Sequence, residues 1–479
     1  ETELVAIDKV RGKKKLVHSL IKHINEEKGD KKIEKLEGQI KTYYQRLLFF
    51  SFLTKDKVAS LDDILNVIDK DENIRLSKNL FLDKGIIEKI SKVMDPFKRS
   101  RLDYKIQNIS MLACDESIAP LTRAMTSIKK FNRMSESEVI TPSKVCDEMV
   151  NLLPEEGLKE IIFKQDKLLD IASKSGEYAV SLYKRLTSEL GYSHEDVKDI
   201  IYSIPTSSIA YEFTRRFYEI LDINVENIAA EFNAYDLIDV KNDKDEVDYE
   251  RISGILEQGK PFSKITLEDE IKVGEKTVKF GAVIGNPPYQ EELIGTSAKQ
   301  IYNLFMEIGY SISDLAVFIS PGKFLFNAGK TPKKWNSKML NDKYLKVMRY
   351  ESDAKKIFPD IALSSSIVIT VRDKKIISHP IIKFYPDKII KEIVDKVINY
   401  KGFEPMTNII YLQSKFNTKK LFEDKPQFKK IIGTERRLIT PILQKDLDVF
   451  HLSPLKDSVK IYGNDNKGIL TSKYINKIY

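Results

Sequence analysis

The sequence predicts an α/β fold, in which a mixed and mostly parallel sheet follows a helical region. From about residue 167 onward, apolar runs too short for helices recur, and several of them end at proline, glycine or small polar residues. Buried parallel strands have this pattern. Segments with apolar residues at helical spacing separate the runs, as crossover helices separate parallel strands. Before about residue 130 only the helical spacing occurs. We therefore expect a helical domain followed by an α/β domain.

Length and composition fit a globular protein of two or three domains. The chain has 479 residues, too many for one compact core, and 42% of them are hydrophobic. Changes in composition near residues 131 and 375 predict domains over 1–130, 131–375 and 376–479. No apolar run reaches the roughly 18 residues of a membrane span, so we expect a cytoplasmic protein that does not bind a membrane. Because the chain starts at Glu1 and ends on a strand-like segment, we expect a fragment of a longer protein.

Charge, cysteines and histidines narrow the classes of function. The net charge of +8 favours a polyanionic partner such as nucleic acid. Two cysteines and five scattered histidines lack the spacing of a disulfide framework or a zinc site, so we expect no metal. The basic run Arg11–Lys15 is typical of a solvated face, with phosphate contact as the alternative. Gly329-Lys330-Thr331 is not a phosphate loop, because Phe324 stands where that motif needs glycine.

Helical signals dominate the first part of the chain. Between Ile33 and Phe50, apolar residues recur at helical spacing. Further on, Thr141-Pro142 is typical of a helix start, since proline is favoured at the first helical position and threonine caps the free N–H groups. These residues alone predict only a capped helix.

The segment from Lys167 to Tyr178 predicts a strand, a tight turn and a helix start. Asp170 and Ala172 lie on the strand, and Ser173 and Gly176 belong to the turn. Small residues let the backbone approach a ligand closely, and a helix amino terminus offers free N–H groups. This pattern favours a ligand site at the turn.

Two further strands are expected before the middle of the chain. The strand at 200–204 is followed by Pro205, Thr206 and Ser207. Thr206 and Ser207 either cap the helix that begins near Ile209 or hydrogen-bond a ligand. A third strand is expected within 225–240, with Asp236 just after it. Asp236 is either a ligand contact or an ordinary loop aspartate.

The most informative stretch is the apolar run Phe280–Ile284 and the residues that follow it. Two consecutive prolines neither continue a sheet ladder nor start a helix freely, so Asn286-Pro287-Pro288-Tyr289 must form a rigid loop at the carboxyl end of a buried strand. Ligands of open α/β sheets bind at this edge. The loop offers an amide, backbone carbonyls and an aromatic face, which suit a flat aromatic substrate with an exocyclic amine.

This loop resembles the Asn-Pro-Pro-Tyr motif of γ-type adenine-N6 DNA methyltransferases, which use S-adenosylmethionine. Residues 357–371 resemble the end of the catalytic domain of Eco57I-type restriction-modification methylases. The resemblance implies a Rossmann-like methyltransferase domain with double-stranded DNA as partner, followed by the start of a target-recognition region, and a restriction or specificity partner outside the chain. It implies catalytic roles for the four loop residues. The implied cofactor-binding residues are Thr141, Pro142, Asp170, Ala172, Ser173, Gly176 and Asp236.

Two positions depart from the family pattern. Lys174 stands where the turn is expected to have its first glycine, and a lysine there disfavours positive φ. Pro205 follows the second strand where an acid is expected to bind the cofactor ribose. A chain with a degraded cofactor site would be an inactive DNA-recognition module. The same tetrapeptide also occurs in methyltransferases that act on RNA or on protein. Asn286 favours adenine, because cytosine-N4 enzymes usually carry serine at this position.

Three more strands are expected, at 315–321, 345–350 and 366–371. Between them, the basic stretch Lys330–Lys338 contains Trp335. Lysines beside an aromatic ring suit DNA contact, and a solvated loop is the equal alternative.

Overall fold

The computed structural model describes residues 30–131, 140–271, 279–290, 299–359, 366–406, 415–433, 447–464 and 470–477, with the single residues 410, 442 and 479. The basic run at 11–15 lies outside them. The chain forms two compact units, Glu1–Phe384 and Tyr385–Tyr479.

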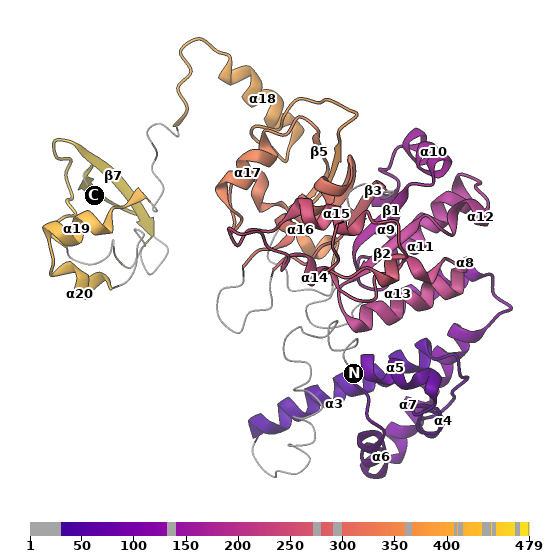
Figure 1. Ribbon diagram of the computed structural model, residues 1–479. Helices are drawn as coiled ribbons and strands as arrows, with labels where there is room; N and C mark the ends of the chain where they lie inside the picture. Colours follow the sequence, from indigo (N-terminus) through magenta and orange to yellow (C-terminus); the bar gives the residue numbers. More distant parts are fainter. Residues whose placement is uncertain are drawn as a thin grey trace. The chain divides into compact units, whose positions relative to one another are not determined.

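The first unit contains the sheet that the sequence predicted (Figure 1). Its strands run in the order β2-β1-β3-β4-β6-β5. The first four are parallel, and β6 is antiparallel to both of its neighbours. Six of the seven strands expected for this sheet are therefore confirmed, as is the fold class. The bounds are β1 (Lys167–Ser173), β2 (Ile201–Pro205), β3 (Phe280–Gly285), β4 (Leu315–Pro321), β5 (Leu345–Glu351) and β6 (Ile367–Asp373).

Helices cover both faces of this sheet, because alternate strand residues enter two separate cores. Leu168 and Ile284 pack against one layer, and Leu169 and Val283 against the other. The first layer contains α9 (Ser143–Val150), α10 (Glu155–Lys164), α11 (Glu177–Lys184), α12 (His194–Val197) and α13 (Ser208–Leu221). The second contains α14 (Ala234–Leu237), α15 (Tyr249–Leu256), α16 (Tyr302–Ile312) and α17 (Lys333–Leu340). Short turns are η1 (Arg185–Glu189), η2 (Val225–Asn227), η3 (Phe262–Lys264), η4 (Gly322–Phe326) and η5 (Ala354–Lys356).

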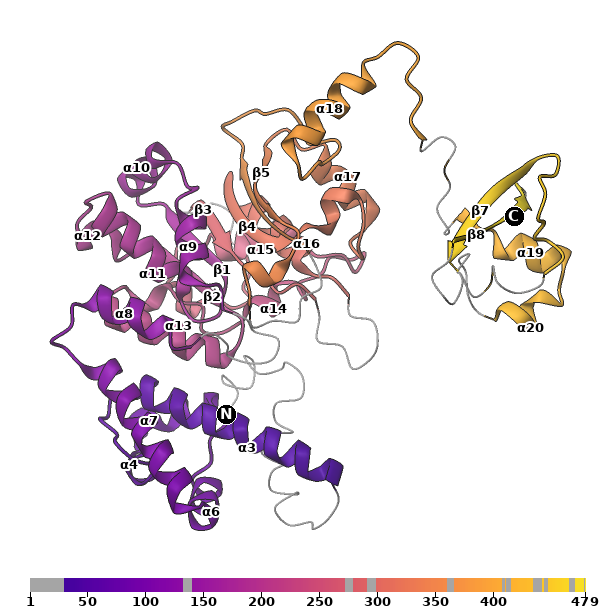
Figure 2. The same ribbon diagram turned by 180° about the vertical axis from the view of Figure 1, so that it is seen from behind.

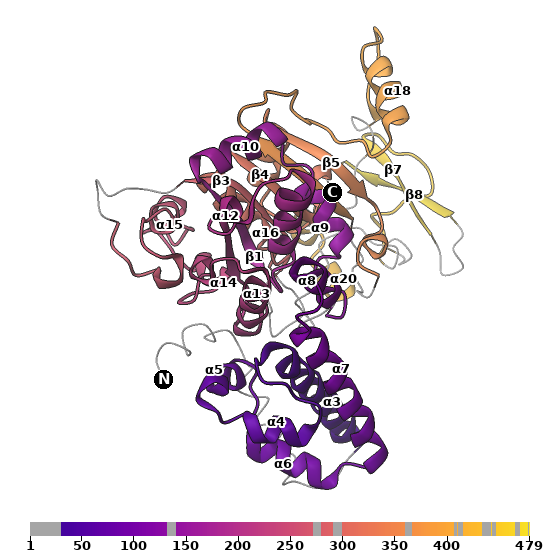
Figure 3. The same ribbon diagram turned by 90° about the vertical axis from the view of Figure 1, so that its right-hand side faces the viewer.

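The helical region at the start of the first unit is also confirmed (Figure 3). Its helices are α3 (Asp30–Leu53), α4 (Leu61–Val67), α5 (Asp71–Asn79), α6 (Lys84–Val93), α7 (Pro96–Cys114) and α8 (Pro120–Ile128). Ser60 and Asp83 cap α4 and α6 with their side chains. Phe52 of α3 packs against Phe213 and Phe217 of α13, so the helical region and the α/β part share one core.

The second unit has a small core of its own. It contains α18 (Lys388–Ile398), α19 (Thr418–Asp424), α20 (Phe428–Ile432) and the antiparallel pair β7 (Ser458–Asn464) and β8 (Leu470–Asn476) (Figure 2). Leu421, Phe428 and Ile475 are buried between these helices and strands. Across both units, the described helices include none with the length and apolar character that a bilayer crossing demands.

The expected third strand within 225–240 is wrong. This segment forms η2 and α14, and it meets the sheet through the parallel bridge between Ser203 and Ile228. The physical reason is local capping. Asn224 accepts from the N–H of Glu226, and Asn233 accepts from the N–H of Tyr235. Each side chain turns the backbone into a helical start before a strand can extend.

The basic stretch around Trp335 is also not a loop. Its residues from Lys333 onward form α17, and the Trp335 ring packs edge-on against Tyr302 and Phe324. With 8% of its surface exposed, Trp335 belongs to the core and is not available for base stacking. The apolar contacts of the Trp335 ring therefore bury this residue, although its neighbours in the sequence are polar.

Candidate active site

The order of the strands brings the predicted ligand turn beside the predicted catalytic loop. β1 and β3 are neighbours, and Asp170 is paired with Ile284. Both strands are parallel, so the turn at 173–176 and the loop at 286–289 leave the sheet at the same edge. A Cβ atom built on Gly285 would lie 3.8 Å from the Asp170 carboxylate and 3.1 Å from the Ile171 side chain. This close approach explains why glycine ends β3.

Two polar groups of Asn286 are held by hydrogen bonds to other parts of the chain. Its backbone carbonyl accepts from the Lys174 ammonium at 2.7 Å, and its Nδ2 donates to Thr141 Oγ1 at 3.1 Å. The side-chain oxygen Oδ1 is buried and has no hydrogen-bond donor among the described residues. Buried acceptors without a donor are costly in a folded protein. Oδ1 is thus a fixed, desolvated acceptor.

The rest of the loop is rigid and mostly buried. Pro287 and Pro288 are both buried, and the Tyr289 carbonyl accepts from the N–H of Ile301 at 3.2 Å. The Tyr289 ring is half-buried, whereas its hydroxyl is wholly buried and burial raises its pKa. The ring contacts the cores on both faces of the sheet. Part of an aromatic surface is therefore exposed at a fixed position beside Asn286.

The turn after β1 depends on one glycine. Gly176 has a φ of 78°, and a Cβ there would lie 3.3 Å from the Thr214 backbone. Its N–H donates to Ser173 Oγ at 3.1 Å, and that hydroxyl also meets Thr214 Oγ1 at 3.0 Å. Lys174 is not among the residues with positive φ. The expected conflict between lysine and the turn is therefore wrong, because only position 176 needs the left-handed conformation.

Asp170 is a fully buried carboxylate. Its Oδ1 accepts from the N–H of Ala172 at 3.3 Å, and Oδ2 has no partner among the described residues. Burial, and next the neighbouring Glu177 carboxylate, raise the pKa of Asp170 well above its usual range. The acid thus offers a second desolvated acceptor next to the catalytic loop.

Glu177 is a site residue that sequence reasoning missed. It is 1% exposed, its Oε1 accepts from the N–H of Thr141 at 3.4 Å, and its Oε2 accepts from the N–H and hydroxyl of Ser175 at 2.9 and 3.1 Å. Its position directly after Gly176, in the first turn of α11, was the available signal. Glu177 joins the segment before α9 to the turn.

Thr141 has a different role from the expected helix cap. α9 begins at Ser143, directly after Pro142, with no side-chain cap. The Thr141 hydroxyl instead accepts from Asn286 Nδ2 and from the Tyr178 hydroxyl, the latter at 3.3 Å. Thr141 is therefore a support of the catalytic loop.

The remaining predicted residues have mainly local contacts. Ser207 caps α13 by accepting from the N–H of Ala210, which confirms the capping interpretation, and the N–H of Thr206 donates to the Ser173 carbonyl at 2.9 Å. Asp236 accepts from the N–H of Asn233 at 2.9 Å and so caps α14. The structure brings Thr141, the turn and Asn286 together, whereas the Asp236 carboxylate caps α14.

The comparison with known families agrees with this geometry. Residues 199–358, which contain the loop at 286–289, match the family model described as Eco57I restriction-modification methylase. This segment is therefore similar to the methylases of that family. The similarity implies S-adenosylmethionine as the methyl donor. A search of curated proteins gave no match.

Solved structures similar to this chain share little sequence with it. The type ISP restriction-modification enzyme LlaBIII bound to DNA is 13% identical, with 79% of this chain and 28% of that chain covered and a TM-score of 0.41. A type I restriction-modification methyltransferase subunit from Streptococcus thermophilus is 13% identical, with 81% and 93% covered and a TM-score of 0.35. A class I S-adenosylmethionine-dependent methyltransferase from Listeria monocytogenes is 11% identical, with 74% and 98% covered and a TM-score of 0.35. The chain thus spans less than a third of the LlaBIII chain.

The residues on β1 and in the turn after it fit this cofactor. S-adenosylmethionine carries an ammonium group and two ribose hydroxyls, which are hydrogen-bond donors. Asp170 Oδ2 is a buried acceptor without a donor among the described residues. Only glycine fits at position 176, where the backbone turns into α11. The chain therefore offers an acceptor and a narrow turn at the sheet edge where such ligands bind.

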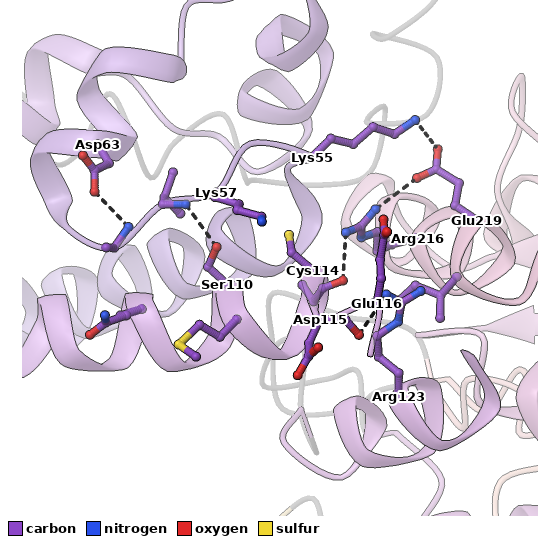
Figure 4. Close-up of a pocket in the computed structure, with 16 residues that line it drawn as sticks. Lys55, Lys57, Asp63, Ser110, Cys114, Asp115, Glu116, Arg123, Arg216 and Glu219 are labelled. Carbon is purple, nitrogen blue, oxygen red and sulfur yellow. Dashed lines mark hydrogen bonds and ion pairs between the residues drawn. The ribbon is translucent and has the colours of Figure 1, made fainter. Parts of the chain in front are cut away.

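A separate cavity of about 950 Å³ lies between α7, α8 and α13 (Figure 4). Three of its charged side chains pair with one another. Glu219 pairs with Lys55 and Arg216, each at 3.6 Å, and Arg216 also donates to the Ala113 carbonyl. None of the residues of the turn or the catalytic loop lines this cavity. The cavity is lined by charged residues and is not part of the candidate active site.

Proposed function

We propose that the protein is a site-specific DNA methyltransferase that transfers a methyl group to N6 of an adenine. One observation carries the proposal most strongly. Asn286 presents a buried acceptor, Oδ1, that has no donor among the described residues, at the carboxyl end of β3 and next to two rigid prolines. An exocyclic amine supplies the donor that this oxygen lacks.

The geometry of acceptance explains how the amine is activated. The N6 lone pair of adenine is conjugated with the ring, so the amine is a poor nucleophile. Asn286 Oδ1 and the Pro287 carbonyl accept the two N6 hydrogens. This pairing favours a pyramidal nitrogen whose lone pair points away from the ring. Because both acceptors lie on a loop that proline makes rigid, orienting them costs little conformational entropy.

The target base must leave the duplex to reach this loop, since N6 is otherwise inside the base stack. The exposed part of the Tyr289 ring stacks on the extruded base. Stacking of this kind stabilises a bound base by about 1–3 kcal/mol. Tyr289 therefore supports binding of the flipped base, whereas Asn286 supports the transfer step.

The cofactor side of the site is formed by the turn after β1. S-adenosylmethionine supplies an electrophilic methyl group. Asp170 accepts hydrogen bonds from it, and Ala172, Ser173 and Gly176 let the backbone approach it. The implied contacts of Thr141 and Pro142 with its methionine end, and of Asp236 with its adenine, belong to the same proposal.

Methyl transfer from tritiated S-adenosylmethionine tests the proposal. The purified chain is given unmethylated bacteriophage λ DNA, total transfer RNA or a soluble protein extract, and the labelled nucleoside is identified by mass spectrometry. We expect N6-methyladenine in DNA, lost in Asn286→Ala and retained in the control Asn341→Ala, whose side chain bonds only α17. N4-methylcytosine, or label in RNA or protein alone, would refute the adenine DNA assignment. A folded chain without transfer to any substrate would favour an inactive recognition module.

A further inference from the structure

Lys174 is the turn residue that departs from the family pattern, and its side chain reaches the catalytic loop. It is 5% exposed, and its ammonium donates to the Asn286 carbonyl at 2.7 Å. The contact crosses from the end of β1 to the end of β3, which are neighbouring strands. A glycine at position 174 has no side chain with which to make this contact.

The charges around Lys174 favour a fixed ammonium. Asp170 on β1 and Glu177 at the start of α11 lie on either side of the turn and are 0% and 1% exposed. Two buried carboxylates are costly without a neighbouring cation. The Lys174 charge acts on the Asp170 carboxyl, opposing the larger effects of burial and of Glu177 on its pKa. The lysine therefore has an electrostatic reason to stay inside, and its donor is directed at the loop.

The contact constrains the part of the loop that matters for transfer. The peptide group between Asn286 and Pro287 is planar, and proline locks its own φ. Holding the Asn286 carbonyl therefore fixes the plane from which Pro287 starts, and leaves a single torsion to set the direction of the Pro287 carbonyl. Thr141 holds the Asn286 side chain from the other end. Lys174 and Thr141 together fix both acceptors assigned to the target amine.

We propose that Lys174 is a positioning residue, which ties the cofactor turn to the catalytic loop and sets the acceptors for the target amine. This proposal rests on the proposed function. Lys174 acts through Asn286, so its loss changes the transfer step more than the affinity for S-adenosylmethionine. Lys174 therefore contributes to the function of the site and does not indicate a degraded cofactor site.

The experiment compares Lys174→Met, Lys174→Arg and the control Lys184→Met in the full chain. Lys184 lies on α11 and pairs with Asp147 and Glu189, so its variant loses surface ion pairs without touching the loop. Three quantities are measured: kcat and KM for S-adenosylmethionine on λ DNA, the calorimetric Kd of S-adenosylmethionine, and amide hydrogen exchange of the segment 280–290.

In Lys174→Met we expect kcat to fall about ten- to a hundredfold, the usual effect of losing a charge-assisted hydrogen bond. KM and Kd for S-adenosylmethionine stay within about threefold, exchange at 280–290 becomes faster, and Lys174→Arg recovers most of kcat. Lys184→Met resembles the wild type in all three quantities.

Two results would overturn the proposal. A kcat for Lys174→Met near the wild-type value shows that the contact does not position the loop. Weaker binding of S-adenosylmethionine at unchanged kcat makes Lys174 a cofactor ligand instead. If the wild type transfers no methyl group to DNA, the proposed function fails. The exchange measurement then still tests whether Lys174 links the turn to the loop. Faster exchange at 280–290 in Lys174→Met supports the link between turn and loop, and unchanged exchange refutes it.

Discussion

The amide nitrogen of Asn286 lies 3.1 Å from the hydroxyl oxygen of Thr141, although 145 positions separate the two residues in the chain. The same hydroxyl accepts from Tyr178 at 3.3 Å. With Nδ2 engaged in this way, the amide oxygen is the atom left for a ligand. The segment before α9 thus orients the side chain that the proposed reaction depends on.

Thr141→Val removes this acceptor while keeping the shape of the side chain. We expect kcat for methyl transfer to λ DNA to fall about tenfold, because a buried donor left without a partner costs about 1–3 kcal/mol. Thr141→Ser retains the hydroxyl and stays close to the wild type. Thr187→Val is the control, since the Thr187 hydroxyl bonds only the Tyr183 carbonyl within its own helical segment. Equal rates for the valine and serine variants would show that Thr141 does not orient Asn286.

Two substitutions at Tyr289 distinguish stacking by its ring from hydrogen bonding by its hydroxyl. Its hydroxyl is buried without a partner among the described residues, so Tyr289→Phe is expected to keep kcat and to leave the free energy of unfolding equal or higher. Tyr289→Ala loses the ring and weakens DNA binding about 5- to 150-fold, which corresponds to about 1–3 kcal/mol of stacking. Initial rates over a range of DNA concentrations, with urea unfolding of each variant, measure both effects. A Phe variant as impaired as the Ala variant would contradict the stacking role.

Gly176 and Gly191 form a matched pair for the turn. Their φ values are 78° and 76°, but a Cβ on Gly176 would lie 3.3 Å from the Thr214 backbone, whereas a Cβ on Gly191 meets nothing within 4 Å. Both alanine variants bear the cost of a left-handed residue, about 1 kcal/mol. Gly176→Ala is expected to lose further stability in urea unfolding and to lose binding of S-adenosylmethionine in calorimetry. Gly191→Ala keeps cofactor binding. Equal behaviour of the two variants would remove the steric argument for the turn.

Lys167 gives a pH dependence with a definite sign. This first residue of β1 is 4% exposed, and burial lowers its pKa to about 8. The rings of Tyr202, Phe280 and Phe262 lie 4.7, 5.3 and 5.6 Å from its ammonium and favour the charged form, so they oppose the effect of burial. Since the unfolded chain holds this proton up to its usual pKa, it binds more protons than the folded chain above about pH 8.

The free energy of unfolding is therefore expected to rise with pH between about pH 8 and pH 10 through this group. Lys167→Met removes the rise. The difference between wild type and variant in urea unfolding, measured across this range, isolates the contribution of Lys167 from other titrating groups. A pH-independent difference would mean that the three rings hold the lysine charged over the whole range.

Much of the fold was predictable because strand signals are local. The apolar runs that became β1, β3 and β4 end at small residues or proline, and these signals do not depend on distant contacts. The prediction of a third strand within 225–240 was wrong for a reason that is equally local. Asn224 and Asn233 cap helical turns and interrupt any strand between them. The prediction of an exposed loop around Trp335 was wrong for a non-local reason, because the contacts of Trp335 with Tyr302 and Phe324 form only after folding.

By itself, the sequence determined the rigid loop at 286–289. Strand, glycine and paired prolines are consecutive, so backbone chemistry alone places Asn286 and Tyr289 in a rigid loop at the edge of the sheet. Only the tertiary structure decided what holds this loop. Thr141 proved to be a support and not a cap, Lys174 proved to reach Asn286, and Glu177 proved to join the turn to the segment before α9. These contacts depend on β1 lying beside β3, a pairing between segments far apart in the chain that no local pattern encodes.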